Sequence, residues 1–168
     1  IMSIAKKHNL FVIEDCAQAH GAKYKGVSVG SIGHIGCWSF CQDKIMTTGG
    51  EGGMVTTNDK SLWLKMWEYK DHGKSYEAVY EREHPEGFRW IHESFGTNWR
   101  MTEMQGVIGR IQLKKMSQWT KLRNHNANIL TKAFSRFSSK DGILKIPQLN
   151  TDHGSIHAYY KYYVFVKE

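Results

Sequence analysis

The chain has 168 residues, of which 40% are hydrophobic and 12% aromatic, a composition typical of a globular protein and not of a disordered one. It contains no apolar run of about 18 residues, so the sequence predicts no membrane-spanning helix. The net charge of +7 comes from 23 basic and 16 acidic residues that are spread along the chain, and a dispersed excess of this kind does not indicate a nucleic-acid-binding surface.

Strands are predicted where short apolar runs occur. Residues 1–8 have the pattern of the last turns of an amphipathic helix, with Asn9 as the C-cap. The apolar runs that follow predict strands at residues 10–13, 35–40, 54–57, 143–146 and 159–166. A helix that leads into a buried strand is typical of a parallel sheet in an α/β fold.

Two further helices are predicted from helical spacing. The first covers residues 61–70 and is expected to bury Leu62, Met66 and Tyr69. The second is a long helical region that starts after Thr102 and runs to residue 138, with room for a break at residues 115–117. Residues 75–96, between these helices, show no regular pattern. They fit either a functional loop near a substrate or dimer contact, or a packed surface excursion.

The strongest local pattern lies at residues 36–53. A predicted strand leads to Lys44, a turn with the sequence TTGGEGG follows, and a second predicted strand leaves the turn. The glycines allow positive φ angles and let the backbone approach a ligand closely. A desolvated lysine loses its proton more easily, and its neutral amine can then attack a carbonyl carbon. The same pattern also fits a surface lysine beside a glycine-rich hairpin.

A second candidate group lies upstream, after the apolar run at residues 10–13. Glu14 and Asp15 follow this run directly, and acidic groups just beyond the carboxyl end of a strand lie where open α/β sheets bind ligands. A carboxylate and a reactive lysine meet the requirements of a pyridoxal phosphate site. The lysine forms a Schiff base, and the carboxylate pairs with the pyridinium nitrogen. Asp15 and Lys44 are therefore the candidates for these two roles.

Five separated motifs resemble those of the DegT/StrS-type nucleotide-sugar aminotransferases. They are residues 14–18 (EDCAQ), residues 29–33 (VGSIG), Ser39 and Phe40 with Lys44, residues 47–53 (TTGGEGG) and residues 96–103 (GTNWRMTE). The resemblance runs from about residue 10 to the end of the chain. It implies an α/β fold of the fold type I pyridoxal phosphate-dependent transferases, similar to aspartate aminotransferase. Residues 1–138 would be the later part of the large domain with connector helices, and residues 139–168 the start of the small domain.

The resemblance also implies roles for individual residues. Lys44 would form the Schiff base and carry the proton, and Asp15 would be the pyridinium partner. Gln18 would lie against the ring oxygen of the cofactor, and the hydroxyl of Ser39 would bind its phosphate. Asn98 would reach the phosphate of the neighbouring subunit, which implies a homodimer.

The implied reaction is the transfer of an amino group, with L-glutamate as the expected donor, to a keto nucleotide-sugar, as in lipopolysaccharide biosynthesis. The anionic cofactor and sugar nucleotide would be sufficient partners for the basic charge, without nucleic acid or membrane. His72, Arg100 and His157 are candidates for substrate anions by position alone. A sugar dehydratase of the same fold is an alternative, but such relatives replace the lysine by histidine. A non-catalytic regulator built on this fold is a second alternative. The presence of Asp15, Gln18, Ser39 and Lys44 argues against it.

Three cysteines, Cys16, Cys37 and Cys41, form no paired framework. An odd number without a secretory signal favours a reducing, cytoplasmic location. His34, Cys37 and Cys41 could be imagined around zinc, but no second cysteine pair supports such a site. The chain also starts without methionine, inside an apparent helix, and is expected to be a piece of a longer protein that is inactive alone.

Overall fold

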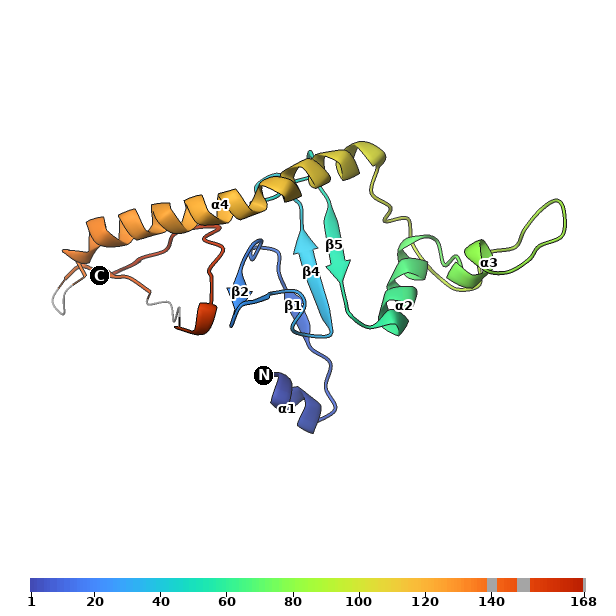
Figure 1. Cartoon of the computed structure of the whole chain (residues 1–168), viewed down its shortest axis with the longest axis horizontal. Helices are drawn as coiled ribbons and strands as arrows, with labels where there is room; N and C mark the ends of the chain where they lie inside the picture. The colour runs from blue at the N-terminus through green and yellow to red at the C-terminus, as the bar shows by residue number, and fades with distance from the viewer. Residues whose placement is uncertain (139–141, 148–151, 168) are drawn as a thin grey trace.

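A small mixed sheet forms the centre of the computed structural model, which describes residues 1–138, 142–147 and 152–167 (Figure 1). Its three strands, in the order β1-β4-β5, are β1 (Ile13–Asp15), β4 (Ile35–Ser39) and β5 (Gly53–Thr56). β1 runs parallel to β4, and β5 runs antiparallel to it. The parallel strand expected after the first helix is thus present, although it starts later than predicted, and the carboxyl ends of β1 and β4 lie at one edge of the sheet.

The register decides which side chains share a face of the sheet. Asp15 pairs with Cys37, and Ser39, two residues further along β4, pairs with Gly53. Because side chains alternate along a strand, Asp15, Cys37 and Ser39 belong to one face, while Trp38 belongs to the other.

Glu14 ties the loop before β4 to the end of β1. Its carboxylate accepts backbone hydrogen bonds from Gly30 at 2.8 Å, Ile32 at 2.8 Å and Gly33 at 2.6 Å. Burial raises the pKa of Glu14, but the three backbone donors outweigh that effect and hold its pKa below the usual value. The acidic residue and the glycine-rich motif that follows it are thus two halves of one structural contact.

Helices and short ladders surround the sheet. The helices are α1 (Met2–Lys7), α2 (Lys60–Lys70), α3 (Tyr76–Tyr80), α4 (Glu103–Ser135) and the 3-10 helix η1 (Asp152–Gly154). Two antiparallel pairs join β2 (Lys23–Tyr24) to β3 (Val27–Ser28) and β6 (Leu144–Lys145) to β7 (Phe165–Val166). None of the helices in the described ranges is both long and apolar enough to cross a membrane.

The long helix α4 crosses the top of the sheet in Figure 1 and is bonded to the loop between β4 and β5. Thr102 and Gln105 form a capping box at its start. Gln105 Nε2 donates to Glu51 O at 2.7 Å, and Gln112 Oε1 accepts from Thr47 N at 2.9 Å. Gly109 lies between these two glutamines on the same helix face and is buried, so this face holds the loop against the helix.

The core is small and lies directly under the Lys44 loop. It consists of Phe40, Ile45, Met46, Met116 and Ala158, which are all at most 9% exposed. The members come from the end of β4, the loop after Lys44, helix α4 and the C-terminal segment. Packing of these four parts therefore fixes the loop that carries the lysine.

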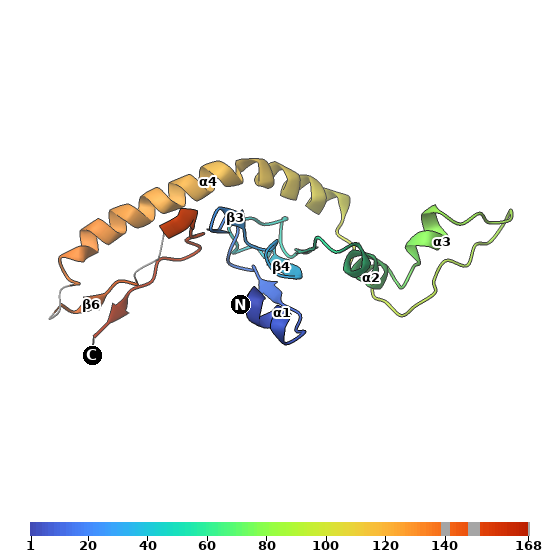
Figure 2. The same cartoon turned by 60° about the horizontal axis from the view of Figure 1, so that its bottom comes forward.

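Residues 75–96 form an arm that projects away from the sheet (Figure 2). The arm begins with α3. The segment that leads back from its tip is joined to the start of α3, because Ser75 N donates a hydrogen bond to Ile91 O at 2.8 Å. Arg82 and Glu93 form an ion pair across the arm. Phe88 is 85% exposed and Phe95 97% exposed, and the ring of Phe88 meets that of Trp90 at 6.3 Å between centroids, so these aromatic side chains are largely uncovered.

Some predictions from the sequence are wrong in position or burial. The first strand begins at Ile13 and not at residue 10, and Leu10 and Phe11 are 57% and 74% exposed. The reason is that β1 is an edge strand of the described sheet. Tyr69, expected to be buried by α2, is 50% exposed. Phe11 and Tyr69 each meet one ring, those of His34 and Trp99, and these single contacts leave most of their surface exposed.

The later elements also differ from expectation. α4 is continuous from Glu103 to Ser135, so there is no break at residues 115–117, a stretch without proline or glycine. The predicted strand at residues 159–166 reduces to β7, because Tyr159 has a positive φ of 46° and the chain before it is bonded to α4. The remaining predicted strands, at residues 35–40, 54–57 and 143–146, are confirmed within one or two residues at each end.

Candidate active site

Lys44 lies in a closed loop just beyond the carboxyl end of β4. Phe40 anchors this loop, because its N–H donates to Gly52 O at 2.8 Å and its carbonyl accepts from Thr48 N at 3.3 Å. Lys44 N donates to Cys41 O at 3.0 Å, which forms a turn at the lysine itself. Gly49 has a φ of 80°, where a side chain would strain the backbone. The glycine-rich turn therefore closes the loop that presents the lysine.

The other predicted residues of the site lie at the same edge. Asp15 ends β1, and its Oδ1 accepts a hydrogen bond from Ala17 N at 3.0 Å. Gln18 is exposed in the turn that follows. Ser39 ends β4, and its Oγ accepts from Cys41 N at 3.3 Å, which leaves the hydroxyl hydrogen free to be donated. Parallel pairing of β1 and β4 thus brings a carboxylate, an amide, a hydroxyl and the lysine to one edge.

The electrostatics of Lys44 correct one expectation. Burial lowers the pKa of Lys44, as the sequence suggested, but the hydrogen bond and charge of Asp43 outweigh burial, so the pKa is raised above its usual value. Asp43 Oδ1 lies 3.4 Å from Lys44 Nζ, and the ring of Tyr160 lies 5.1 Å from the same nitrogen. The lysine side chain is 15% exposed. Its resting form is therefore the ammonium ion.

Asn98 and Arg100 occupy a different place, at the end of α2. Asn98 forms a backbone bridge with Asp71, and Arg100 Nε donates to Asn98 Oδ1 at 3.1 Å. Arg100 Nη1 also lies 3.5 Å from Asp71 Oδ1, and Lys74 Nζ lies 3.2 Å from it. Burial raises the pKa of Asp71, but these cations hold it below its usual value. The chain does not bring Asn98 to its own Lys44 loop.

The two candidate histidines have local contacts. His72 donates its backbone N–H to Thr97 O at 3.1 Å, and its ring packs against His92 at 6.3 Å between centroids. His157 Nδ1 accepts from Tyr159 N at 3.1 Å. The ring of His157 therefore supports a backbone turn, while the ring of His72 contacts the neighbouring histidine ring. Arg100 differs, because it lines a hollow of about 770 Å³ between β5 and α2.

Several residues near Lys44 were missed by sequence reasoning. Asp43 is its direct neighbour and was detectable as a carboxylate beside a lysine. Tyr160 was not detectable, because only the fold brings it to the loop. His20 is 4% exposed and packs against Trp38 at 5.3 Å between ring centroids. Burial lowers the pKa of His20, and the charge of Lys44 acts in the same direction.

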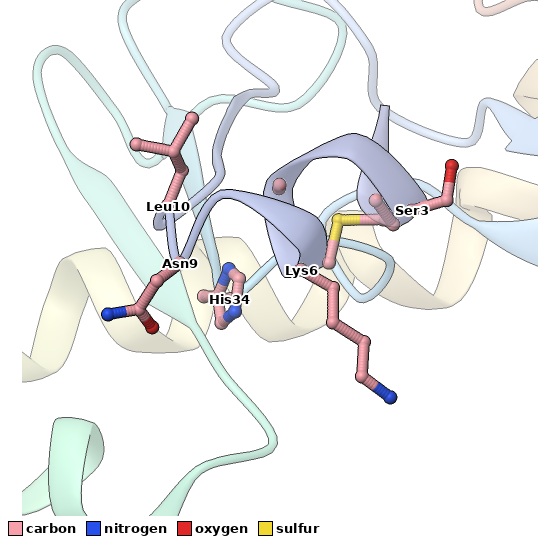
Figure 3. Close-up of a pocket in the computed structure, with 7 residues that line it drawn as sticks. Ser3, Lys6, Asn9, Leu10 and His34 are labelled. Atoms are coloured by element: carbon pink, nitrogen blue, oxygen red, sulfur yellow. The ribbon is translucent and has the colours of Figure 1, made fainter.

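A cavity of about 430 Å³ lies at the opposite end of β1 and is lined by residues that include Ser3, Lys6, Leu10 and His34 (Figure 3). His34 Nδ1 accepts from Val12 N at 2.9 Å, so this cavity borders the amino ends of the parallel strands. Open α/β sheets bind ligands at the carboxyl ends, which favours the Lys44 edge as the site.

No metal site competes with this assignment. Among residues 1–138, 142–147 and 152–167, no group of three or more His, Cys, Asp or Glu is placed to hold a metal ion. Burial raises the pKa of Cys16 to about 11, with the charges of Glu14 and Asp15 acting in the same direction. This thiol is therefore protonated at neutral pH and is a packing group.

The fold is that of an aminotransferase. The chain is similar to the X-ray structure of the aminotransferase from Psychrobacter cryohalolentis, with a TM-score of 0.94 and 67% identity over 99% of this chain and 42% of that chain. The predicted fold class, an incomplete α/β transferase fold, is thereby confirmed. The chain belongs to the DegT/DnrJ/EryC1/StrS aminotransferase family, whose family model matches residues 1–168.

Two curated relatives agree with this family. The GDP-perosamine synthase of Escherichia coli O157:H7 is 42% identical over 79% of this chain and 33% of its own length. The UDP-N-acetyl-3-dehydro-alpha-D-glucosamine 3-aminotransferase of Acidithiobacillus ferrooxidans is 40% identical over 76% of this chain and 31% of its own length. The chain thus spans about a third of the length of the curated relatives it matches.

Proposed function

We propose that the whole protein carrying this chain is a pyridoxal phosphate-dependent aminotransferase that moves an amino group from L-glutamate to a keto nucleotide-sugar. The observation that carries the proposal is the gathering of Lys44, Asp15, Gln18 and Ser39 at one edge of the sheet. The relatives support the substrate class, because the name of one contains a GDP-linked sugar and that of the other a UDP-linked sugar.

The donor set at this edge fits pyridoxal phosphate. Bound pyridoxal phosphate supplies an aldehyde for a lysine amine and a pyridine ring that draws electrons from the reacting carbon. Lys44 is the amine, and Asp15 is a carboxylate for the ring nitrogen. Ser39 has a hydroxyl hydrogen to donate to a phosphate oxygen, and Gln18 has an amide for the ring oxygen. Each of these side chains is exposed or half-buried at the edge, so none has to be uncovered first.

The proton transfer is assigned to Lys44 Nζ. Lys44 Nζ would first have to give up the proton of its resting ammonium form; the neutral amine would then accept the proton that leaves the substrate carbon, and Asp43, 3.4 Å away, would stabilise the ammonium ion that results. Lys44 then returns this proton to the carbon that receives it. The carboxylate of Asp15 would pair with the ring nitrogen of the cofactor.

We also propose that the working unit is a homodimer in which Asn98 serves the site of the partner. Two observations support this: Asn98 is exposed, and its contacts lie at the end of α2 and not in the Lys44 loop. The division at residue 138 into a large-domain part and the start of a small domain is retained as a proposal. The dehydratase alternative is disfavoured by the lysine at position 44, where such enzymes are expected to carry histidine.

Borohydride reduction tests the central assignment. The whole protein, loaded with pyridoxal phosphate and reduced, is expected to carry the pyridoxyl label on Lys44 in a peptide map. Lys44→Ala should abolish labelling and glutamate-dependent conversion of the cofactor. Lys114→Ala, an exposed position on α4, should change neither. A label on any other lysine of the wild-type protein would refute the proposal.

A further inference from the structure

Tyr160 contacts the Lys44 loop from a distant part of the chain. Its ring lies 5.1 Å from Lys44 Nζ, and its hydroxyl donates a hydrogen bond to Asp43 Oδ2 at 2.5 Å. Asp43 Oδ1 in turn lies 3.4 Å from Lys44 Nζ. We propose that Tyr160 is a positioning residue for Lys44, and that its ring and the Asp43 carboxylate together hold the amine whenever it is not bonded to a cofactor. This inference rests on the proposed role of Lys44.

The segment that carries Tyr160 is anchored on both sides. Lys23 and Ile156 exchange two backbone hydrogen bonds of 2.9 Å, which attach the segment to β2. Arg123 Nη1 on α4 donates to Tyr159 O at 3.0 Å, next to Ala158, which is 2% exposed and belongs to the core. The position of Tyr160 is therefore fixed by the same core that supports the lysine loop.

The backbone turns sharply just before Tyr160. Tyr159 has a φ of 46°, a left-handed conformation that is rare for a bulky residue. His157 supports the turn, because its Nδ1 accepts from Tyr159 N and its carbonyl accepts from Asn124 Nδ2 at 3.0 Å. Strained residues persist where the surrounding structure holds them, and they cluster at functional sites. The left-handed backbone at Tyr159 turns the chain so that the next side chain, Tyr160, faces Lys44, which accounts for the strain.

The charges around Lys44 are consistent with its amine being held in place by the Tyr160 ring and the Asp43 carboxylate. Asp43 and Cys41 face the amine from its own loop, while Tyr160 and His20 face it from the C-terminal segment and the turn after β1. The hydrogen bond from Tyr160 lowers the pKa of Asp43, so Asp43 stays anionic. Burial lowers the pKa of His20, so this ring is neutral and does not repel the ammonium ion.

One anion and one aromatic face then hold the cation, which is a favourable pairing for an ammonium group. Lys161 Nζ lies 5.3 Å from the same ring, so Tyr160 pairs with a second cation as well. Lys161 is exposed and follows Tyr160 directly, whereas Lys44 is held in place by its loop. Loss of Tyr160 would remove both the ring beside Lys44 Nζ and the hydrogen bond to Asp43 in the lysine loop, so it should act mainly on Lys44.

Competitive acetylation of the cofactor-free whole protein tests the inference without an activity assay. Acetic anhydride reacts with neutral amines, so the labelling rate of Lys44 depends on its pKa and on how accessible its amine is to the reagent. Tyr160→Leu is expected to raise Lys44 labelling about threefold at mildly alkaline pH, the factor that follows from loss of a cation–π contact of this kind. Tyr163→Leu is the matched control, because Tyr163 is 59% exposed, and it should leave Lys44 labelling unchanged.

Lys74, paired with Asp71 in another part of the chain, reports on unfolding in the same peptide map. Unchanged Lys44 labelling in a folded Tyr160→Leu protein would overturn the inference. If Lys74 labelling rises as well, Tyr160→Leu has unfolded the protein, and Tyr160→Phe decides instead. The phenylalanine keeps the ring but loses the anchor on Asp43, so Lys44 labelling should still rise above wild type, and no rise would overturn the inference.

Asp43→Asn supplies an independent measurement. The amide keeps a hydrogen-bond acceptor for Tyr160 but removes the negative charge, so the midpoint of Lys44 labelling should move to lower pH. If the pH midpoint of Lys44 labelling does not move in Asp43→Asn, Asp43 does not help to hold the amine. The inference and the proposed function fail separately. A pyridoxyl label on another lysine refutes the function, whereas the acetylation pattern of the cofactor-free protein refutes only the hold.

Discussion

Replacing Gly21 by alanine is expected to weaken the contact between α4 and the turn that carries Gln18. Gly21 has a φ of 81°, and a Cβ added there would lie 2.2 Å from Thr120 Oγ1 and 3.3 Å from Thr120 Cβ. Thr120 Oγ1 is not free to move without loss, because it donates to Met116 O at 2.9 Å. The substitution therefore combines backbone strain with a clash against the helix.

The structure supplies a control that separates these two effects. Gly26 has a nearly equal φ of 79°, but nothing lies within 4 Å of its added Cβ. Gly26→Ala should cost about 1 kcal/mol, since left-handed strain of about 1–2 kcal/mol is partly offset by a stiffer unfolded chain. Gly21→Ala adds overpacking of about 1–3 kcal/mol, for a total of about 2–4 kcal/mol.

Urea unfolding of the whole protein, followed by circular dichroism, compares the two variants with the double variant Gly21→Ala/Thr120→Ala. The double variant should recover much of the extra cost, because the atom at 2.2 Å is gone while the one at 3.3 Å remains. The pyridoxal phosphate affinity of Gly21→Ala should fall, because the displaced turn carries Gln18. Equal costs for Gly21→Ala and Gly26→Ala, or no recovery in the double variant, would refute the packing of α4 on this turn.

Three further outcomes are expected from the whole protein. Asp15→Asn should keep cofactor binding but lose most transamination, because an amide does not stabilise the protonated ring nitrogen, and near wild-type single-turnover rates would count against this assignment. Inactive Lys44→Ala and Asn98→Asp proteins should recover activity when mixed, and no recovery after proven subunit exchange would mean that each site is built from one chain. The pKa of His20 is lower in the folded than in the unfolded protein, so stability present above about pH 6.5 should be lost as the pH falls. His20→Asn should reduce this acid sensitivity, which unfolding midpoints across pH would measure, whereas the exposed His125→Asn should not.

The parts of the site that could be predicted from sequence are those that are local in the chain. Asp15 follows an apolar run and Lys44 precedes a glycine-rich turn, so both stood in patterns of a few residues. Their meeting followed from one rule, that parallel strands end at the same edge of a sheet. The position of β4 was predicted to within a residue because its apolar run has paired strands on both sides.

The parts that could not be predicted depend on contacts between distant residues. Tyr160 and Asp43 are joined by a hydrogen bond across 117 positions, and no local pattern marks such a pair. The raised pKa of Lys44 has a local cause, because the opposing charge comes from the adjacent Asp43; what the sequence does not tell is that the two side chains point toward each other, with 3.4 Å between Lys44 Nζ and Asp43 Oδ1. The exposure of Leu10 and Phe11 shows the converse, since an apolar run predicts burial only where another element lies against it.

The uninterrupted course of α4 has a consequence for how the chain can change length. A helix advances about 1.5 Å and turns about 100° with each residue. Gln112 is hydrogen-bonded to the lysine loop, and Arg123 to the backbone of Tyr159. The number of helical residues between Gln112 and Arg123 therefore fixes the distance and rotation between these two contacts. One inserted residue between them would swing the second contact by about 100° and remove Tyr160 from Lys44, while seven would restore the facing but shift it by about 10 Å. Insertions should therefore be tolerated in the arm at residues 75–96 and not within this stretch of α4.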